Sequence, residues 1–259
     1  LPAYLDALLR EIAHTGALLK NSGFHIRTLY MGGGTPTTLS STQMARLLDA
    51  INRNFDLSRC LEFTVEGGRP DTLDTQKLCV IKDGGATRIS INPQTMADDV
   101  LNAVGRKHTS AQTVEAFHQA RAAGFEDINM DLIVGLPGES LSDVADTMEV
   151  IRKLAPDNLT VHSLAIKRAA RLNIQRERYQ DFEIVNTADH IALTSKVAEE
   201  MGLFPYYLYR QKNMSGNLEN VGYAKEDKAG IYNILIMEEK QSIIAAGDRK
   251  STRLNSSHT

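Results

Sequence analysis

The chain has 259 residues, of which 42% are hydrophobic, and its formal net charge is −3 at pH 7. A chain of this size and apolar content can bury a substantial core, and the small net charge gives no basic footprint for a nucleic acid. It contains no apolar run long enough to cross a membrane, and two cysteines are too few for a disulfide-stapled secreted protein. We expect a cytoplasmic globular protein that neither binds nucleic acid nor inserts into a membrane.

The stretch from Leu29 to Leu39, LYMGGGTPTTL, places three consecutive glycines at the end of an apolar run. Glycine suits a main chain that must approach another group closely or adopt positive φ, and Pro36 fixes the exit of the turn. This turn is a candidate docking surface for a ligand. A strand-to-helix turn without a ligand is the alternative interpretation.

Four later segments alternate polar and apolar residues as strands do, at residues 61–66, 87–92, 128–136 and 158–166. Helical patterns alternate with them at residues 41–55, 71–83, 111–124 and 141–154. Alternating strands and helices predict βα units and a parallel sheet. A flat parallel sheet is covered on both faces and is expected to show unbroken apolar runs, so the polar face of these strands favours a barrel, complete or incomplete.

The polar side of these strands predicts a ligand site. Its residues are Glu62, Glu66, Arg88, Ser90, Asn92, Asn129 and Asp131. Such side chains are costly inside a barrel unless they face water or a polar ligand. Ligand sites in these folds lie at the carboxyl ends of the strands, where the sequence places residues 32–35, Glu66, Gln94 and Asp131.

Several motifs in order resemble one enzyme family. They are GGGTP, a Glu followed by a Pro-containing turn, Gln94 shortly after Asn92, Gly105-Arg106-Lys107, and NMDLIVGLPGE. This set resembles the radical S-adenosylmethionine (SAM) enzymes of the oxygen-independent coproporphyrinogen III oxidase family. YYLYRQKNMSGNLENVGYA and YNILIMEEKQSIIAAG resemble its HemZ-like, coproporphyrinogen dehydrogenase branch.

The resemblance implies an α/β fold, a partial TIM-like (β/α) barrel of the radical SAM type whose first strand is missing. We expect this barrel in residues 1–175 and a small C-terminal α+β extension in residues 176–247. Residues 248–259, DRKSTRLNSSHT, read as a disordered, non-native tail and are excluded from fold reasoning.

The resemblance also implies SAM contacts, carried over position by position. The residues are Gly33, Gly34, Thr35, Glu66, Gln94, Arg106, Asp131, Ala165 and Val221. The glycine turn would meet the amino acid end of SAM, Glu66 would hold a charged or hydroxyl group, and Val221 would make a main-chain contact near the adenine. The other positions line the cofactor region of the related oxidases, some of them around a second SAM. A buried pair between Arg106 and Asp131 is the alternative.

One feature of the family is absent from this sequence. These enzymes hold a 4Fe-4S cluster with a CxxxCxxC motif ahead of the GGGTP strand, whereas this chain has only Cys60 and Cys79, without metal-ligand spacing. We predict that both are reduced, buried thiols. The chain begins without an initiator Met on an amphipathic helix, residues 1–20, so we expect an N-terminally truncated, inactive piece of a cluster-bearing parent.

The implied activity is oxidative decarboxylation of coproporphyrinogen III to protoporphyrinogen IX in haem (porphyrin) biosynthesis, through a 5′-deoxyadenosyl radical made from SAM. The implied partners are a tetrapyrrole substrate and an electron donor. Two alternatives stay open: a haem chaperone of the same family, and an unrelated barrel hydrolase that uses Glu66 and Asp131 as acid and base.

Basic and aromatic residues late in the chain are candidates for tetrapyrrole contacts. Lys167, Arg168, Arg171 and Arg210 could pair with propionates, and Tyr206, Tyr207, Tyr209 and Tyr223 could line a flat macrocycle. A solvated basic patch and ordinary aromatic packing are the respective alternatives.

Overall fold

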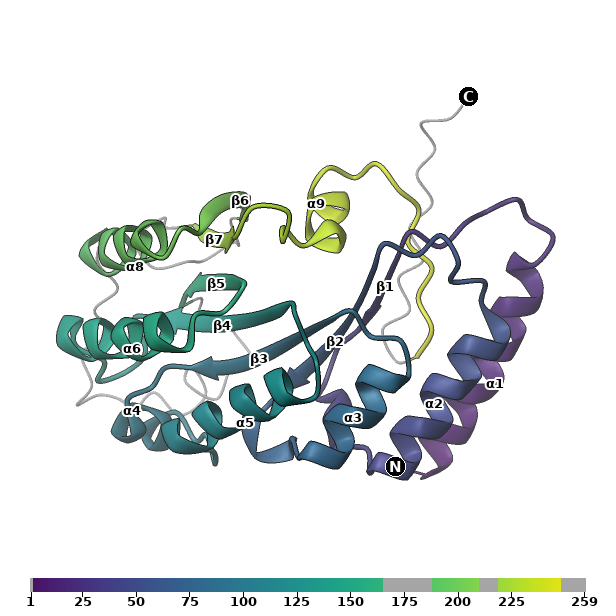
Figure 1. The fold of residues 1–259 in the computed structure, drawn as a ribbon, viewed down its shortest axis with the longest axis horizontal. Coiled ribbons are helices and arrows are strands. Elements are labelled where there is room, and N and C mark those ends of the chain that lie inside the picture. The colour runs from purple at the N-terminus through teal and green to yellow at the C-terminus, as the bar shows by residue number, and fades with distance from the viewer. Residues whose placement is uncertain (1, 165–187, 210–218, 248–259) are drawn as a thin grey trace.

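The computed structural model describes residues 2–164, 188–209 and 219–247. Its strands form one seven-stranded sheet in the order β1-β2-β3-β4-β5-β7-β6. The parallel strands are β1 (Thr28–Met31), β2 (Glu62–Gly68), β3 (Arg88–Gln94), β4 (Ile128–Val134) and β5 (Asn158–Ser163). β7 (Asn220–Ala224) runs antiparallel to β5, and β6 (Phe204–Tyr209) runs antiparallel to β7. The sheet curls into a half-barrel, which confirms the predicted partial barrel (Figure 1).

Most helices cover the convex side of the sheet (Figure 1). They are α1 (Pro2–Leu19), α2 (Ser41–Asn54), α3 (Thr75–Asp83), α4 (Asp98–Ala103), α5 (Ser110–Ala122), α6 (Leu141–Leu154) and α8 (Ala188–Glu200). α9 (Ile231–Met237) lies on the opposite, concave side, where it contacts β1 and β6. Among the described helices, none is long and apolar enough to span a membrane.

Local sequence explains where the helices begin. α2, α5 and α6 start at capping boxes whose first residues are Ser40, Thr109 and Ser140. In each box a hydroxyl and a side chain three residues later satisfy N–H groups that a helix cannot pair internally. The predicted helix 141–154 matches α6, whereas the predicted helix 71–83 divides into the 3₁₀ turn η2 (Pro70–Thr72) and α3.

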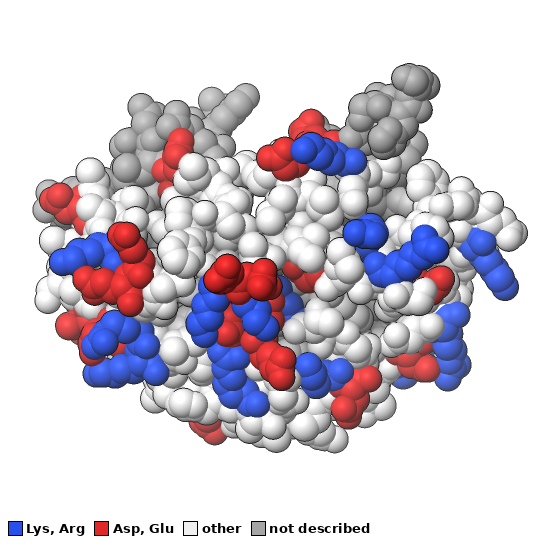
Figure 2. All heavy atoms as spheres, turned by 45° about the horizontal axis from the view of Figure 1, so that its top comes forward, with Lys and Arg blue, Asp and Glu red and all other residues white. Residues whose placement is uncertain are grey.

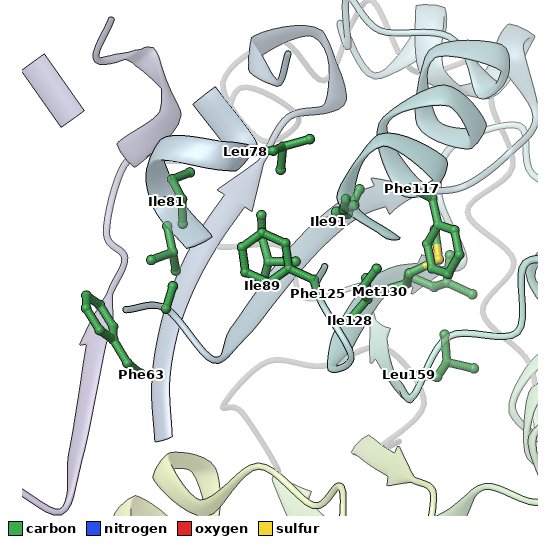
Figure 3. Packing of buried hydrophobic residues seen from close by; sticks show 14 of the residues in the cluster. Phe63, Leu78, Ile81, Ile89, Ile91, Phe117, Phe125, Ile128, Met130 and Leu159 are labelled. Atoms are coloured by element: carbon green, nitrogen blue, oxygen red, sulfur yellow. The ribbon is translucent and has the colours of Figure 1, made fainter. Parts of the chain in front are cut away.

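The apolar side of the strands packs against the convex helices, as their alternation predicts. Phe63, Ile89 and Met130 from β2, β3 and β4 are fully buried with Phe117 of α5 (Figure 3). The predicted segment 61–66 begins one residue earlier than β2, and its first residue, Leu61, is 52% exposed and does not join the core. The opposite side of these strands is free to carry polar residues into the concave space.

Two successive βα turns have similar sequences and are joined by hydrogen bonds. The 3₁₀ turns η1 (Pro36–Thr38) and η2 each begin with a proline shortly after two or more glycines. Lys77 of α3 donates from Nζ to the carbonyls of Thr37 and Thr72, both at 2.7 Å. The hydroxyls of Thr37 and Thr72 lie 2.6 Å apart, and Thr37 also donates to the Gly67 carbonyl at 2.6 Å. These bonds fix the glycine turn beside the end of β2.

The C-terminal strands extend the same sheet. β7 is hydrogen-bonded to β5 from Val161↔Val221 to Asn158↔Ala224, and β6 pairs with its other side. The predicted division between barrel and extension, at residue 175, falls outside the described residues. The two-part organisation of residues 1–175 and 176–247 therefore stays a prediction.

Candidate functional site

Polar residues of neighbouring strands line up across the concave face. Glu66, Ser90 and Asn129 are in register on β2, β3 and β4. Asp131 lies two residues after Asn129 on β4, on the same face of the sheet, and pairs with Thr160 of β5. It is the middle residue of β4 rather than its end, because the strand continues to residue 134. The sheet thus brings two predicted carboxylates into the same half-barrel.

Glu66 is held by the first strand and the glycine turn. The Tyr30 hydroxyl donates to Oε1 at 2.5 Å, and the Gly33 N–H donates to Oε2 at 3.3 Å. A Cβ at Gly32 would lie 2.5 Å from the Tyr30 ring and 2.8 Å from the Glu66 carboxyl carbon. A side chain at residue 32 would therefore displace the Tyr30 ring or the Glu66 carboxylate, and Gly33 has the positive φ of 111° that glycine tolerates.

A second tyrosine, Tyr232, packs beside Tyr30 and Glu66. The rings of Tyr30 and Tyr232 are stacked, with centroids 4.3 Å apart. Burial, reinforced by the nearby Glu66 charge, raises the pKa of both phenols, and the Asp131 charge adds to the effect on the pKa of Tyr30. Tyr30 is therefore protonated and available as a hydrogen-bond donor at neutral pH.

Asp131 belongs to a hydrogen-bond network that crosses three strands. Asn129 donates from Nδ2 to Asp131 Oδ1 at 2.6 Å and to the Ser90 hydroxyl at 2.8 Å. Thr160 donates to Asn129 Oδ1 at 3.1 Å, and Ser90 lies 3.5 Å from Asp131 Oδ2. Tyr207 borders this network, since the Asp131 charge adds to the effect of burial in raising the pKa of its phenol. The network fixes the carboxylate with neutral donors.

Two further buried polar residues of the concave face bind the chain itself. Glu62 accepts the Ile231 N–H at 2.6 Å, and Arg88 donates to the Lys228 carbonyl at 3.3 Å and lies 3.7 Å from Asp127. These two residues were expected to face a ligand or water. They instead anchor the segment that leads into α9, which removes part of the cost of burying them.

Gln94 and Arg106 occupy the rim of the half-barrel. Gln94 ends β3 with a positive φ of 71°, an uncommon conformation for a residue with a side chain. Burial lowers the pKa of Arg106, and the Arg69 charge lowers it further, while Asp71 opposes the shift. Among the described ion pairs none joins Arg106 to Asp131, so the alternative of a buried pair is wrong.

The remaining predicted SAM contacts are spread more widely. Gly34 is exposed beside Gly33, and Thr35 packs against Gly68. Val221 lies in the core with its backbone paired to β5 and β6, and its predicted main-chain contact near the adenine stays a prediction. Ala165 and the basic candidates Lys167, Arg168, Arg171 and Arg210 lie outside the described residues.

The cysteines do not form a cluster site. Within residues 2–164, 188–209 and 219–247, no three His, Cys, Asp or Glu side chains are grouped so that they could hold a metal. Cys60 is half-buried and donates to the Glu62 carbonyl at 3.3 Å. Cys79 is exposed on α3, so the prediction that both thiols are buried is wrong for Cys79. The described residues therefore do not fit a 4Fe-4S cluster.

The same residues do fit SAM. The donors that contact Glu66 and Asp131 include a phenol, an amide N–H, a carboxamide and a hydroxyl. Two carboxylates in a partly buried space favour a positively charged ligand. SAM carries an ammonium, a sulfonium and ribose hydroxyls that suit these acceptors.

Tyr30 and Tyr232 were not among the predicted site residues. Tyr30 lies two residues before the first glycine, on a strand that leads directly into the site, and this position was a usable signal. Tyr232 had no comparable signal, because only the fold of the C-terminal segment brings it back to β1.

These features define a class of protein, an α/β half-barrel with a glycine turn and two carboxylates that suit a cationic ligand on its concave face. The chain belongs to the Radical SAM superfamily, whose family model matches residues 5–151. It is 42% identical over 246 residues to the oxygen-independent coproporphyrinogen-III oxidase-like protein HemZ of Bacillus subtilis, covering 95% of this chain and 49% of that protein.

Two further comparisons agree with this family. The haem chaperone HemW of Bacillus subtilis is 38% identical over 165 residues, which cover 63% of this chain and 43% of HemW. The structure of coproporphyrinogen III oxidase HemN from Escherichia coli shares the fold with a TM-score of 0.73 at 24% identity, covering 98% of this chain and 55% of HemN. The chain thus spans about half the length of the curated relatives it matches.

Proposed function

We propose that this chain is the SAM-binding part of a protein that converts coproporphyrinogen III to protoporphyrinogen IX without oxygen, in haem biosynthesis. The observation that carries the proposal is the 42% identity to the HemZ protein over 95% of the chain. The proposal includes a 4Fe-4S cluster held outside the described residues, an electron donor and a cytoplasmic location. The barrel hydrolase alternative does not account for this family membership.

Glu66 and the glycine turn are proposed to hold one end of SAM. The turn leaves Gly33 and Gly34 exposed, and Glu66 already accepts a main-chain N–H there. Asp131 supplies the second acceptor, and Arg106 on the rim offers a fork of donors that matches a carboxylate. SAM, when bound, supplies the radical chemistry, while these residues bind and orient it.

A groove between β6 and α9 is the proposed position of the tetrapyrrole. Its volume is about 390 Å³, and it is lined by residues 205–208 of β6 and by Ile234, Met237 and Glu238. Tyr206 and Tyr207 offer rings to a flat macrocycle there. Tyr223, by contrast, is buried in the core and unavailable to a substrate.

The surface charge supports a small-molecule partner over a nucleic acid. On the face drawn in Figure 2, acidic and basic side chains are intermixed, without the broad basic area that binds a phosphate backbone. This agrees with the net charge of −3.

The haem chaperone is the second candidate function, and the 38% identity to HemW favours it. The two candidates differ in what happens to the tetrapyrrole. An oxidase removes carbon dioxide from the substrate propionates, whereas a chaperone binds haem and leaves it unchanged.

The experiment uses the product of the complete gene, purified anaerobically after cluster reconstitution. It is incubated with coproporphyrinogen III, SAM and a reductant, and carbon dioxide, 5′-deoxyadenosine and protoporphyrinogen are measured. Formation of all three products supports the oxidase. Stoichiometric haem binding without decarboxylation contradicts the oxidase and supports the chaperone.

A further inference from the structure

We propose that Tyr30 and Tyr232 are positioning residues for Glu66, so that the C-terminal segment completes the SAM site. Tyr30 acts through its hydroxyl, and Tyr232 acts through its ring. The inference rests on the proposed function, because it concerns the same site, but it assigns roles to two residues outside the set of SAM contacts that the family resemblance implies.

The first step is the bond between Tyr30 and Glu66. The phenol donates to Oε1 at 2.5 Å, while the Gly33 N–H takes Oε2 at 3.3 Å. One oxygen is thus fixed from the strand and the other from the glycine turn. Two donors on the two oxygens set the plane of the carboxylate, which decides how Glu66 faces a ligand lying on the turn.

The second step is the stack between Tyr30 and Tyr232. The two rings lie nearly parallel, at 15°, with centroids 4.3 Å apart. Tyr30 is the last-but-one residue of β1, an edge strand, so β2 supports it on one side only. The Tyr232 ring contacts the face of the Tyr30 ring. This contact restricts Tyr30 to the rotamer in which the Tyr30 hydroxyl reaches Glu66.

Hydrogen bonds to β2 and β6 hold the segment that carries Tyr232. Glu62 accepts the N–H groups of Ile231 at 2.6 Å and of Tyr232 at 3.4 Å. The next residue, Asn233, donates to the Tyr206 hydroxyl at 3.2 Å. α9 is therefore fixed to β2 on one side and to β6 on the other, and it presents Tyr232 to β1.

The two tyrosines should respond differently to phenylalanine, and this difference is the test. Tyr30→Phe keeps the ring stack and removes only the hydroxyl. Tyr232→Phe keeps the aromatic ring that stacks on Tyr30, whereas Tyr232→Leu removes that ring. A purely structural role predicts no such asymmetry in ligand binding among variants that fold equally well.

The experiment measures SAM affinity by equilibrium dialysis on the reconstituted product of the complete gene, with thermal unfolding as the check on folding. We expect Tyr30→Phe to weaken binding about 10-fold and Tyr232→Leu about 5-fold, with Tyr232→Phe within about 2-fold of the wild type. Tyr4→Phe, at an exposed ring on α1, is the matched control.

The outcomes separate this inference from the proposed function. If Glu66→Gln abolishes SAM binding but Tyr30→Phe binds as tightly as the wild type, the positioning role is wrong and the proposed function stands. If the wild type itself binds no SAM, both are wrong. Equal weakening by Tyr232→Phe and Tyr232→Leu would also overturn the role assigned to the Tyr232 ring.

Discussion

The N–H of Ile231 in α9 donates to the carboxylate of Glu62 in β2 at 2.6 Å, although the two residues are 169 positions apart in the sequence. Thr64 donates to the same carboxylate at 3.0 Å. A buried glutamate thus anchors the C-terminal segment inside the half-barrel, where that segment presents Tyr232 to the site.

Glu62→Gln should loosen α9. The amide places an N–H donor where the carboxylate accepted main-chain N–H groups. We therefore expect the free energy of unfolding to fall by about 1–3 kcal/mol. Amide hydrogen exchange of residues 231–237 should quicken relative to that of β3. Glu126→Gln, at an exposed position, is the control, and equal exchange in both variants would contradict the anchoring role.

Gly32→Ala should disrupt the glycine turn. The added Cβ would lie within 3 Å of both Tyr30 and Glu66, so one of them must move, at a cost of about 1–3 kcal/mol. Gly34→Ala is the matched variant, because a Cβ there has open space around it. Urea unfolding of the two variants should differ by this amount. Identical midpoints would show that the close approach at residue 32 does not constrain the fold.

Glu139 should make stability depend on pH. Burial raises the pKa of Glu139 to about 7, although the N–H groups of Gly135 and Leu136 oppose the shift. The folded protein then holds a proton between about pH 4.5 and 7 that the unfolded chain releases, so the free energy of unfolding falls as pH rises through this range. The full effect is at most about 3 kcal/mol.

The test compares urea unfolding at pH 5 and pH 8. The wild type should be less stable at pH 8, and Glu139→Gln should reduce that difference, because glutamine does not titrate. Glu126→Gln should keep the wild-type difference. A pH dependence unchanged by Glu139→Gln would contradict the assignment.

Lys77→Met should separate the two 3₁₀ turns. The ammonium group is buried and satisfies the carbonyls of Thr37 and Thr72, so its removal leaves two acceptors without their donor. We expect a loss of about 2–4 kcal/mol in the free energy of unfolding. Lys20→Met, at an exposed position just after α1, should change it by less than about 0.5 kcal/mol. Equal stabilities of the two variants would exclude the bridging role.

Local patterns were enough to predict the barrel. Period-two alternation identified the core faces of β2, β3 and β4, and the helical pattern at residues 141–154 matches the bounds of α6. The polar side was predicted to face inward, and Glu66 and Asp131 do lie there with their neighbours in register. Short-range periodicity carries this information because it depends only on strand and helix geometry.

Long-range contacts could not be predicted in the same way. No pattern near Glu62 or Arg88 indicates that residues 228–231 supply their partners, and the order β5-β7-β6 reverses the last two strands. The position of Arg106 against Arg69 and Asp71, away from Asp131, also depends on how the rim loops fold. These contacts follow from tertiary packing, which a single sequence does not display.

We infer that the concave face of this half-barrel binds SAM through Glu66. Equilibrium dialysis of SAM against the reconstituted product of the complete gene tests this inference by comparing wild type, Glu66→Gln and Glu126→Gln. We expect the wild type and Glu126→Gln to bind alike and Glu66→Gln to bind at least about 10-fold more weakly, since a charge-assisted contact is lost. Undiminished binding by a folded Glu66→Gln variant would show that Glu66 does not hold SAM.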